Sequence, residues 1–221
     1  MNSEDKAPIG VVGAGWVGLV TAVCFAEMGH RVVARDVLPE KVEALKRGEV
    51  TIHEPGLAEL LVKNRERLTF TTDMDELLDS ARLLFVCVDT PPTYSGDADL
   101  SRVRTVVEDL GPDGDHVLIM KSTVPAGTGS SIRRELPGLP YVSCPEFLKE
   151  GTAVHDFMNP DRVVIGAEPE DADAAAEVAA RNPDLDDAER QRTAEAIAIA
   201  ALRYFLVKFT RNKIIAFDID E

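Results

Sequence analysis

Three glycines near the start of the chain, Gly13, Gly15 and Gly18, form the pattern Gly-x-Gly-x-x-Gly directly after a short apolar run. In such a pattern the first glycine allows a tight turn, and the second lets a phosphate group approach the backbone because it has no Cβ atom. The third lets a helix pack closely on a sheet. Asp36 follows at the distance, roughly 20 residues, at which a carboxylate can bind both hydroxyls of a ribose. The spacing therefore predicts a dinucleotide site.

A carboxylate at position 36 favours NAD over NADP, because it would repel a 2′-phosphate. The adjacent Arg35 weakens this preference. Two other interpretations stay open: a glycine-rich turn that binds no ligand, and an Asp36 that only forms a turn at the end of a strand. The free N–H groups at the start of the helix that follows the glycines favour the phosphate site.

The elements that must position these residues alternate between apolar, β-rich runs and segments of helical composition. Strands are expected at 9–12, 32–34, 68–72, 82–88, 116–120, 141–144 and 162–165, and helices at 19–28, 39–47, 57–67, 75–80 (with Asp73 as cap), 100–110, 127–136 and 171–181. This alternation predicts an α/β fold with a doubly wound, Rossmann-like parallel sheet. We expect an NAD-binding domain over residues 1–190 and a short helical C-terminal extension over 191–221.

Polar side chains gather directly after the apolar runs, in Asp89-Thr90, in Lys121-Ser122-Thr123 and in segment 146–150. Parallel sheets of this kind bind ligands outside the carboxyl ends of their strands. We therefore expect these three clusters to line one crevice together with the glycine turn.

The composition excludes several classes of protein. The 221 residues carry a formal net charge of −15, which argues against a nucleic acid or an anionic membrane as partner. No apolar run reaches the roughly 18 to 20 residues that span a bilayer, and the polar segment 1–8 does not resemble a signal peptide, so we expect a cytoplasmic protein. Cys24, Cys87 and Cys144 lack metal-site spacing, so we expect free thiols and no metal.

Six blocks of sequence carry a resemblance to a known family. They are Gly-Ala-Gly-Trp-Val-Gly-Leu (13–19), Glu-Pro-Gly-Leu (54–57), Phe-Val-Cys-Val-Asp-Thr-Pro-Pro (85–92), Lys-Ser-Thr-Val-Pro (121–125), Pro-Glu-Phe-Leu-Lys-Glu-Gly (145–151) and Asp-Phe-Met-Asn-Pro-Asp-Arg-Val-Val-Ile-Gly (156–166). In this order they resemble the N-terminal half of the UDP-glucose/GDP-mannose dehydrogenase family, with the last block most similar to the UDP-glucose members. The resemblance implies oxidation of the C6 alcohol of a nucleotide sugar to a carboxylate, with reduction of two NAD in two successive steps.

The resemblance also implies roles for single residues. Cofactor contacts are implied for Gly13, Gly15, Val17, Gly18, Asp36, Lys41, Thr90, Thr123 and Glu150, and nucleotide-sugar contacts for Glu146, Phe147, Leu148, Lys149 and Glu150. Thr123 and Glu146 would also position the water that releases the oxidised product, because a hydroxyl and a carboxylate can orient a water and accept its proton. The alternatives are a turn or helix-capping role for Thr123 and solvated carboxylates at Glu146 and Glu150.

The resemblance does not extend to the family's nucleophile, a cysteine in a later Gly-Gly-x-Cys motif that does not occur in this sequence. We interpret the nearest candidate, Cys144, as a core thiol. Segment 193–197 resembles the start of the family's connecting helix, through which members dimerise, but Ala198 and Leu202 stand where a lysine and an asparagine are expected. These departures suggest a truncated or rearranged chain, and they weaken the expectation of a homodimer.

Three functions therefore stay open. The first is a nucleotide-sugar dehydrogenase of the UDP-glucose type, or the part of one that binds NAD. The second is a dinucleotide-binding module without turnover, which the missing nucleophile favours. The third is another NAD-dependent hydroxyacid dehydrogenase on the same sheet, and the block at 145–151 counts against it.

Overall fold

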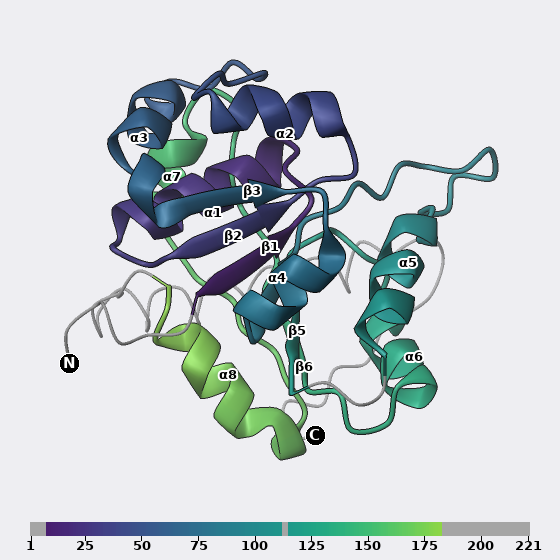
Figure 1. Ribbon diagram of the computed structural model, residues 1–221. Coiled ribbons are helices and arrows are strands. Elements are labelled where there is room, and N and C mark those ends of the chain that lie inside the picture. The colour runs from purple at the N-terminus through teal and green to yellow at the C-terminus, as the bar shows by residue number, and fades with distance from the viewer. Residues whose placement is uncertain (1–7, 112–114, 183–221) are drawn as a thin grey trace, which may run out of the picture. The chain divides into compact units, whose positions relative to one another are not determined.

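A computed structural model describes residues 8–111 and 115–182 of the chain (Figure 1). The expected extension over 191–221 lies outside the described residues, and so do the predictions of a connecting helix and a dimer that depend on it. Within the described ranges no helix is long and apolar enough to cross a membrane.

Six parallel strands form the centre of the described part (Figure 1). They are β1 (Ile9–Val12), β2 (Val32–Arg35), β3 (Leu68–Thr71), β4 (Leu83–Val86), β5 (Val117–Met120) and β6 (Tyr141–Ser143). Their order across the sheet is β3-β2-β1-β4-β5-β6, so the chain winds outward from β1 on one side and from β4 on the other. This is the strand order of a Rossmann-type sheet, which confirms the predicted fold class.

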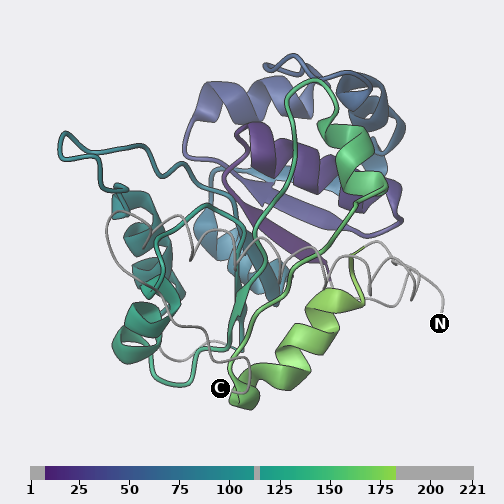
Figure 2. The same ribbon diagram turned by 180° about the vertical axis from the view of Figure 1, so that it is seen from behind.

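Helices cover both faces of this sheet (Figures 1 and 2). One core packs under α1 (Trp16–Glu27), α2 (Pro39–Lys46), α3 (Leu57–Lys63), α7 (Ala153–Met158) and α8 (Ala172–Ala179), and the other under α4 (Met74–Ser80), α5 (Ser101–Leu110) and α6 (Thr128–Glu135). In β4, Leu83 and Phe85 belong to the first core, whereas Leu84 and Val86 belong to the second. Successive strand residues point to opposite faces, so an unbroken apolar run fills both cores.

Most expected elements are present with slightly different ends. Helix α1 begins at Trp16, inside the glycine motif, and not at residue 19. The helix expected at 57–67 ends at Lys63 and is followed by a short 3-10 helix, Arg65–Arg67. Asp73 caps α4 as predicted, because its side chain accepts the backbone N–H groups of Asp75 and Glu76.

One expectation about the segment after β6 is wrong, and one helix there was not expected. The strand expected at 162–165 is absent from the sheet, and only Gly166 forms an isolated antiparallel bridge with Ser143. In this segment Val163 lines a cavity and not a face of the sheet. Helix α7 was not expected at all, because six residues are too short for a helical repeat to be recognised.

The crevice where ligands bind in such folds lies between β1 and β4, which are neighbours in the sheet although their connections leave in opposite directions. The glycine turn follows β1, Asp89 and Thr90 follow β4, and the segment from Lys121 to Thr123 follows β5. The glycine turn and these two polar clusters therefore lie at the carboxyl ends of neighbouring strands.

Candidate functional site

The glycine turn after β1 has the backbone geometry that its sequence predicts. Gly13 has a φ of +94°, and a Cβ atom there would lie 2.8 Å from the carbonyl oxygen of Cys87. A Cβ atom on Gly18 would lie 1.8 Å from the carbonyl oxygen of Gly13, so only glycine lets α1 approach the turn. At Gly15 the nearest atom would be Asp89 Oδ1 at 3.9 Å, which leaves open space beside the backbone.

The open side of Gly15 coincides with the N-terminus of α1, for which Gly15 is the N-cap residue. No side chain of the described residues caps this helix, and its first turn contains no acidic residue. The first N–H groups of a helix lack partners within the helix and attract anions, as does the positive end of its dipole. The turn therefore fits the pyrophosphate of a dinucleotide.

Asp36, at the end of β2, is 6% exposed and holds both the turn and a lysine. Its Oδ2 atom accepts the backbone N–H of Ala14 at 2.9 Å and the Lys41 ammonium at 2.9 Å, and its Oδ1 atom accepts the backbone N–H of Leu38 at 3.1 Å. Burial opposes ionisation, but these donors, with Lys41 foremost, hold the pKa of Asp36 below its ordinary value. The Asp36 carboxylate therefore stabilises a turn through Leu38, and it also stabilises the glycine loop through its bond with Ala14.

A cavity of about 270 Å³ opens beside this turn, at the carboxyl ends of β4 and β5. Its lining residues are Trp16, Val17, Cys87, Val88, Asp89, Thr90, Lys121, Ser122, Thr123 and Glu146. The hydroxyl of Thr90 donates to the carbonyl oxygen of Thr123 at 2.7 Å, which ties the segment after β4 to the segment after β5. Val17, Thr90, Thr123 and Glu146, each predicted from the sequence, are thereby brought together.

Thr123 does not cap a helix, because α6 begins five residues later and has Gly127 as its N-cap. The Thr123 side chain is exposed, and its hydroxyl has no protein partner among the described residues. Glu146 is half-buried and lines both this cavity and a second one. Its Oε2 atom accepts the backbone N–H of Leu148 at 2.5 Å. Within the described part Oε1 has no such bond.

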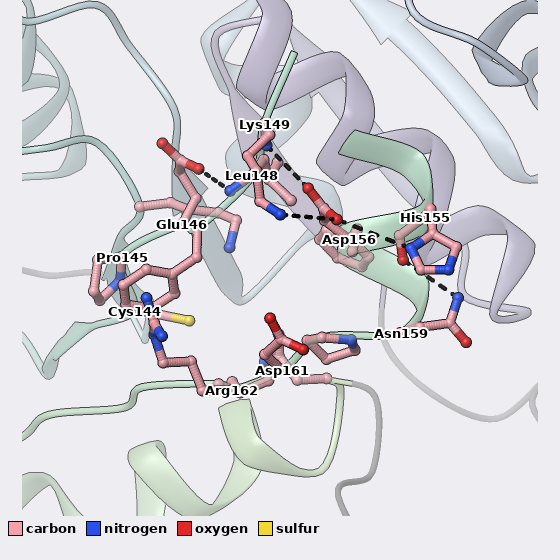
Figure 3. A pocket seen from close by; sticks show the side chains of 16 residues that line it. Cys144, Pro145, Glu146, Leu148, Lys149, His155, Asp156, Asn159, Asp161 and Arg162 are labelled. Carbon is pink, nitrogen blue, oxygen red and sulfur yellow. Dashed lines mark hydrogen bonds and ion pairs between the residues drawn. The ribbon is translucent and has the colours of Figure 1, made fainter. Parts of the chain in front are cut away.

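The second cavity, of about 280 Å³, lies under the 145–151 loop (Figure 3). Figure 3 shows Glu146 at one side of it and Asp156 with His155 at the other. Asp156 accepts the Thr152 hydroxyl at 2.9 Å and the backbone N–H of Lys149 at 3.1 Å. Burial opposes the ionisation of its carboxyl, but these bonds, with that of Thr152 foremost, hold the pKa of Asp156 below its ordinary value. The guanidinium carbon of Arg162 lies 4.2 Å from the centre of the Phe147 ring.

The predicted sugar-binding residues divide at Glu150. Residues 146 to 149 line the second cavity, whereas Glu150 is exposed and lines neither cavity. Its contacts with cofactor and sugar stay predictions. Among the described residues no group of three or more His, Cys, Asp or Glu side chains could hold a metal ion.

Sequence reasoning assigned no role to two buried charged residues at the site, although Lys121 belongs to a cluster that was expected to line the crevice. Lys121 is 5% exposed, lines both cavities and lies with its Nζ atom 5.6 Å from the centre of the Phe157 ring. None of the described carboxylates lies within ion-pair distance of it. Glu54, 6% exposed, bonds to Trp16 and to the chain near Gly151. A charged residue within an apolar stretch was the available signal for Lys121, whereas Glu54 stands in a polar turn and gave none.

The three cysteines are free and buried. Burial, with a smaller effect of the Glu27 charge, raises the pKa of Cys24 to about 12. Burial also raises the pKa of Cys87 to about 12, against an opposing effect of Lys121. The pKa of Cys144, which is 1% exposed, is raised for the same reason. A thiol must ionise to act as a nucleophile, so the environment of Cys144 is that of a core residue.

The strand order, the glycine turn on β1 and the carboxylate at the end of β2 define a Rossmann-type dinucleotide-binding domain. The model of a family described as "UDP-glucose/GDP-mannose dehydrogenase family, NAD binding domain" matches residues 7–181. The chain therefore belongs to the UDP-glucose/GDP-mannose dehydrogenase family, and the cofactor of this domain is NAD, as the sequence predicted.

Relatives in several organisms match the same part of the chain. The UDP-glucose 6-dehydrogenase TuaD of Bacillus subtilis is 43% identical over 170 residues, which are 72% of this chain and 37% of the relative. The UDP-glucose 6-dehydrogenase of Pseudomonas aeruginosa is 46% identical over 171 residues, or 71% and 38%. AglM of Haloferax volcanii, also a UDP-glucose 6-dehydrogenase, is 41% identical over 176 residues, or 72% and 41%. The chain spans roughly two fifths of the length of these curated relatives.

Solved structures agree with this assignment. A UDP-glucose dehydrogenase from Pyrobaculum islandicum superimposes with a TM-score of 0.71 at 37% identity, over 88% of this chain and 50% of that one. A ternary complex of the GDP-mannose dehydrogenase from Pseudomonas aeruginosa gives the same TM-score at 30% identity, over 89% and 51%.

Proposed function

We propose that this chain binds NAD across the 13–18 turn and takes part in oxidising the C6 alcohol of a UDP-glucose-type nucleotide sugar to a carboxylate. The observation that carries the proposal is that Thr123 and Glu146 line the cavity that also contains Val17 of α1. A hydroxyl and a carboxylate that can orient a water thus stand beside the place where a dinucleotide phosphate meets the chain.

Each residue has a distinct task in this proposal. NAD, when bound, supplies the acceptor for the hydride that leaves the sugar. The N-terminus of α1 holds its pyrophosphate, and Asp36 holds its adenosine ribose. Glu146 accepts the backbone N–H of Leu148 with Oε2, so that Oε1 can accept a hydrogen bond from the water that releases the product.

The second cavity is the proposed place of the nucleotide sugar. Lys121, Lys149 and Arg162 line it and provide positive charge for a diphosphate, although the whole chain is acidic. The exposed ring of Phe147 adds apolar surface. UDP-glucose is the substrate that the 41–46% identical relatives support.

Calorimetric titration with NAD, at low and at high salt, tests the proposal. We expect saturable binding to the wild-type chain and at least a tenfold loss in Asp36→Ala, because a hydrogen bond to a charged group contributes about 1.5–3 kcal/mol. Asp97→Ala is the matched control, since Asp97 is an exposed loop aspartate outside both cavities. A folded chain that binds no NAD in either salt would contradict the proposal.

A second function is favoured by one observation: all three cysteines are buried, and none stands in a Gly-Gly-x-Cys motif. The chain by itself would then bind NAD and hold a nucleotide sugar without turnover. Adding NAD and UDP-glucose together distinguishes the two functions, because only turnover produces NADH absorbance. The cytoplasmic location and the homodimer stay predictions.

A further inference from the structure

Glu54, in the turn before α3, is a buried carboxylate that joins three distant parts of the chain. Its Oε2 atom accepts the indole N–H of Trp16 at 3.1 Å and the backbone N–H of Gly151 at 3.0 Å. Its Oε1 atom accepts the backbone N–H of Ala153 at 2.9 Å. The donors belong to the first residue of α1, the end of the 145–151 loop and the first residue of α7.

These bonds give partners to the buried Glu54 carboxylate and to the buried N–H group of Ala153, whereas Trp16 is half-buried and Gly151 is exposed. Burial of a carboxylate is costly unless hydrogen bonds compensate for lost hydration. Helix α7 receives no capping bond from its own N-cap residue, Thr152, so Glu54 supplies the acceptor at that end of the helix. A negative charge is also favourable at a helix N-terminus. Glu54 thus holds the first residue of α7, a helix that packs against α1. Figure 2 shows α7 in green beside α1 in purple.

Of the residues that Glu54 joins, Trp16 lines one cavity, and Gly151 and Ala153 follow the loop residues that line the other. Trp16 lines the cavity beside the glycine turn, and the loop that ends at Gly151 lines the second cavity with residues 146 to 149. Asp156 also holds this loop, by accepting from the Lys149 backbone and from the Thr152 hydroxyl. Those bonds stay within the loop and α7, so they carry no link to the glycine turn.

We propose that Glu54 is a positioning residue through which occupancy of the glycine turn orders the 145–151 loop. A dinucleotide against the first turn of α1 restrains Trp16, and the Glu54 carboxylate passes that restraint to the backbone of Gly151 and Ala153. The inference rests on the proposed function, because NAD is the ligand that acts. Coupling between two sites typically changes an equilibrium about 5- to 150-fold.

Backbone hydrogen exchange over residues 145–153, with and without saturating NAD, measures this coupling. In the wild-type chain we expect NAD to slow exchange at least about fivefold. Trp16→Phe removes one of the three bonds, so we expect it to keep slow exchange at Gly151 and Ala153 without ligand and to lose the effect of NAD. Glu54→Gln keeps one acceptor oxygen and replaces the other by an NH₂ group that faces a donor, so exchange should be fast, with or without NAD, at the one of the two amides that loses its acceptor.

Glu27→Gln is the matched control, because Glu27 stands on the last turn of α1 and accepts from Lys63 and Asn64 at 2.5 and 2.7 Å, away from the glycine turn. Hydrogen exchange over residues 145–153 in Glu27→Gln should match that of the wild-type chain, both with and without NAD. Titration of each variant with NAD sets the saturating concentration. If Glu54→Gln fails to fold, Trp16→Phe decides the question, since it keeps both backbone bonds.

The outcomes separate this inference from the proposed function. Equal slowing by NAD in wild type and Trp16→Phe would overturn the inference, as would a wild-type chain that binds NAD without any slowing of the loop. A wild-type chain that binds no NAD would overturn the proposed function and, with it, the coupling. The ligand-free comparison of Glu54→Gln with Glu27→Gln would then still show whether Glu54 holds the loop.

Discussion

The Lys41 ammonium lies 2.9 Å from Asp36 Oδ2, the oxygen that also accepts the backbone N–H of Ala14. A cation from α2 therefore offsets the negative charge at the end of β2, where discrimination between NAD and NADP is decided. The Lys41 side chain is about a quarter exposed, whereas the Asp36 side chain is almost fully buried. Lys41 is thus placed to weaken the repulsion of a 2′-phosphate.

Lys41→Ala should sharpen the preference for NAD. Because this substitution removes a partly exposed cation next to Asp36, we expect the dissociation constant of NADP divided by that of NAD to rise about fivefold, which is about 1 kcal/mol. Calorimetric titration with both cofactors gives the ratio. Lys46→Ala on the same helix is the control, because Lys46 pairs with the exposed Glu43. A ratio that stays constant or falls in Lys41→Ala would refute this role.

The stability of the fold should depend on the ionisation of Asp36 in acid. Its folded-state pKa is lowered, so the carboxylate stabilises the fold above its unfolded-state pKa of about 3.9, and this contribution is lost as the pH falls through the folded-state value. The wild-type chain should therefore exceed Asp36→Asn in urea stability near pH 6, and the gap should narrow toward about pH 3. A gap of constant size across this range would show that Asp36 is not the titrating group.

The fold was largely predictable because its main signals are local. The runs that form β4 and β5 are apolar without interruption, which is typical of strands buried on both faces. The glycine spacing predicted the turn and the start of the crevice, whereas the bond by which Asp36 braces the turn appears only in the structure. The segment 162–165 has a similar apolar composition, yet it lies beside a cavity and forms no ladder with β6. Composition alone does not distinguish these two environments.

The site was predictable where a residue acts through its own neighbours in sequence, and not where its partners are distant. Thr123 and Glu146 each stand three residues after a strand, and both line one cavity, while their roles stay predictions. Glu54 has partners 97 and 99 residues away, one at the end of the 145–151 loop and one in α7, a helix too short to show a pattern, so no local signal revealed it. Lys121 was visible as a charge after β5, but its burial depends on α7, through Phe157.

The cysteines should resist modification while the chain is folded. The pKa values of Cys24 and Cys87 are raised to about 12, and Cys144 is buried, so little thiolate is present at neutral pH. We expect a thiol-specific disulfide reagent to label none of the three rapidly at pH 8, a pH chosen near the ordinary thiol pKa of about 8.5, and all three in denaturant. Rapid labelling of Cys144 in the folded chain would revive it as a candidate nucleophile.

Substitution by alanine should lower NAD affinity at one glycine of the motif and stability at another. Gly15→Ala has ordinary space for its Cβ atom and a φ of −70°, so the fold should keep its stability, but the methyl group enters the open side that a pyrophosphate needs. We expect NAD affinity to fall at least about tenfold.

Gly18→Ala places its Cβ atom 1.8 Å from the Gly13 carbonyl oxygen, a backbone atom that cannot move away without distorting the turn. The free energy of unfolding should therefore fall by about 3 kcal/mol. Urea unfolding and NAD titration of both variants measure the two effects, and each variant is the control for the other. Wild-type affinity in Gly15→Ala would place the cofactor away from this turn, and wild-type stability in Gly18→Ala would mean that α1 does not pack against it.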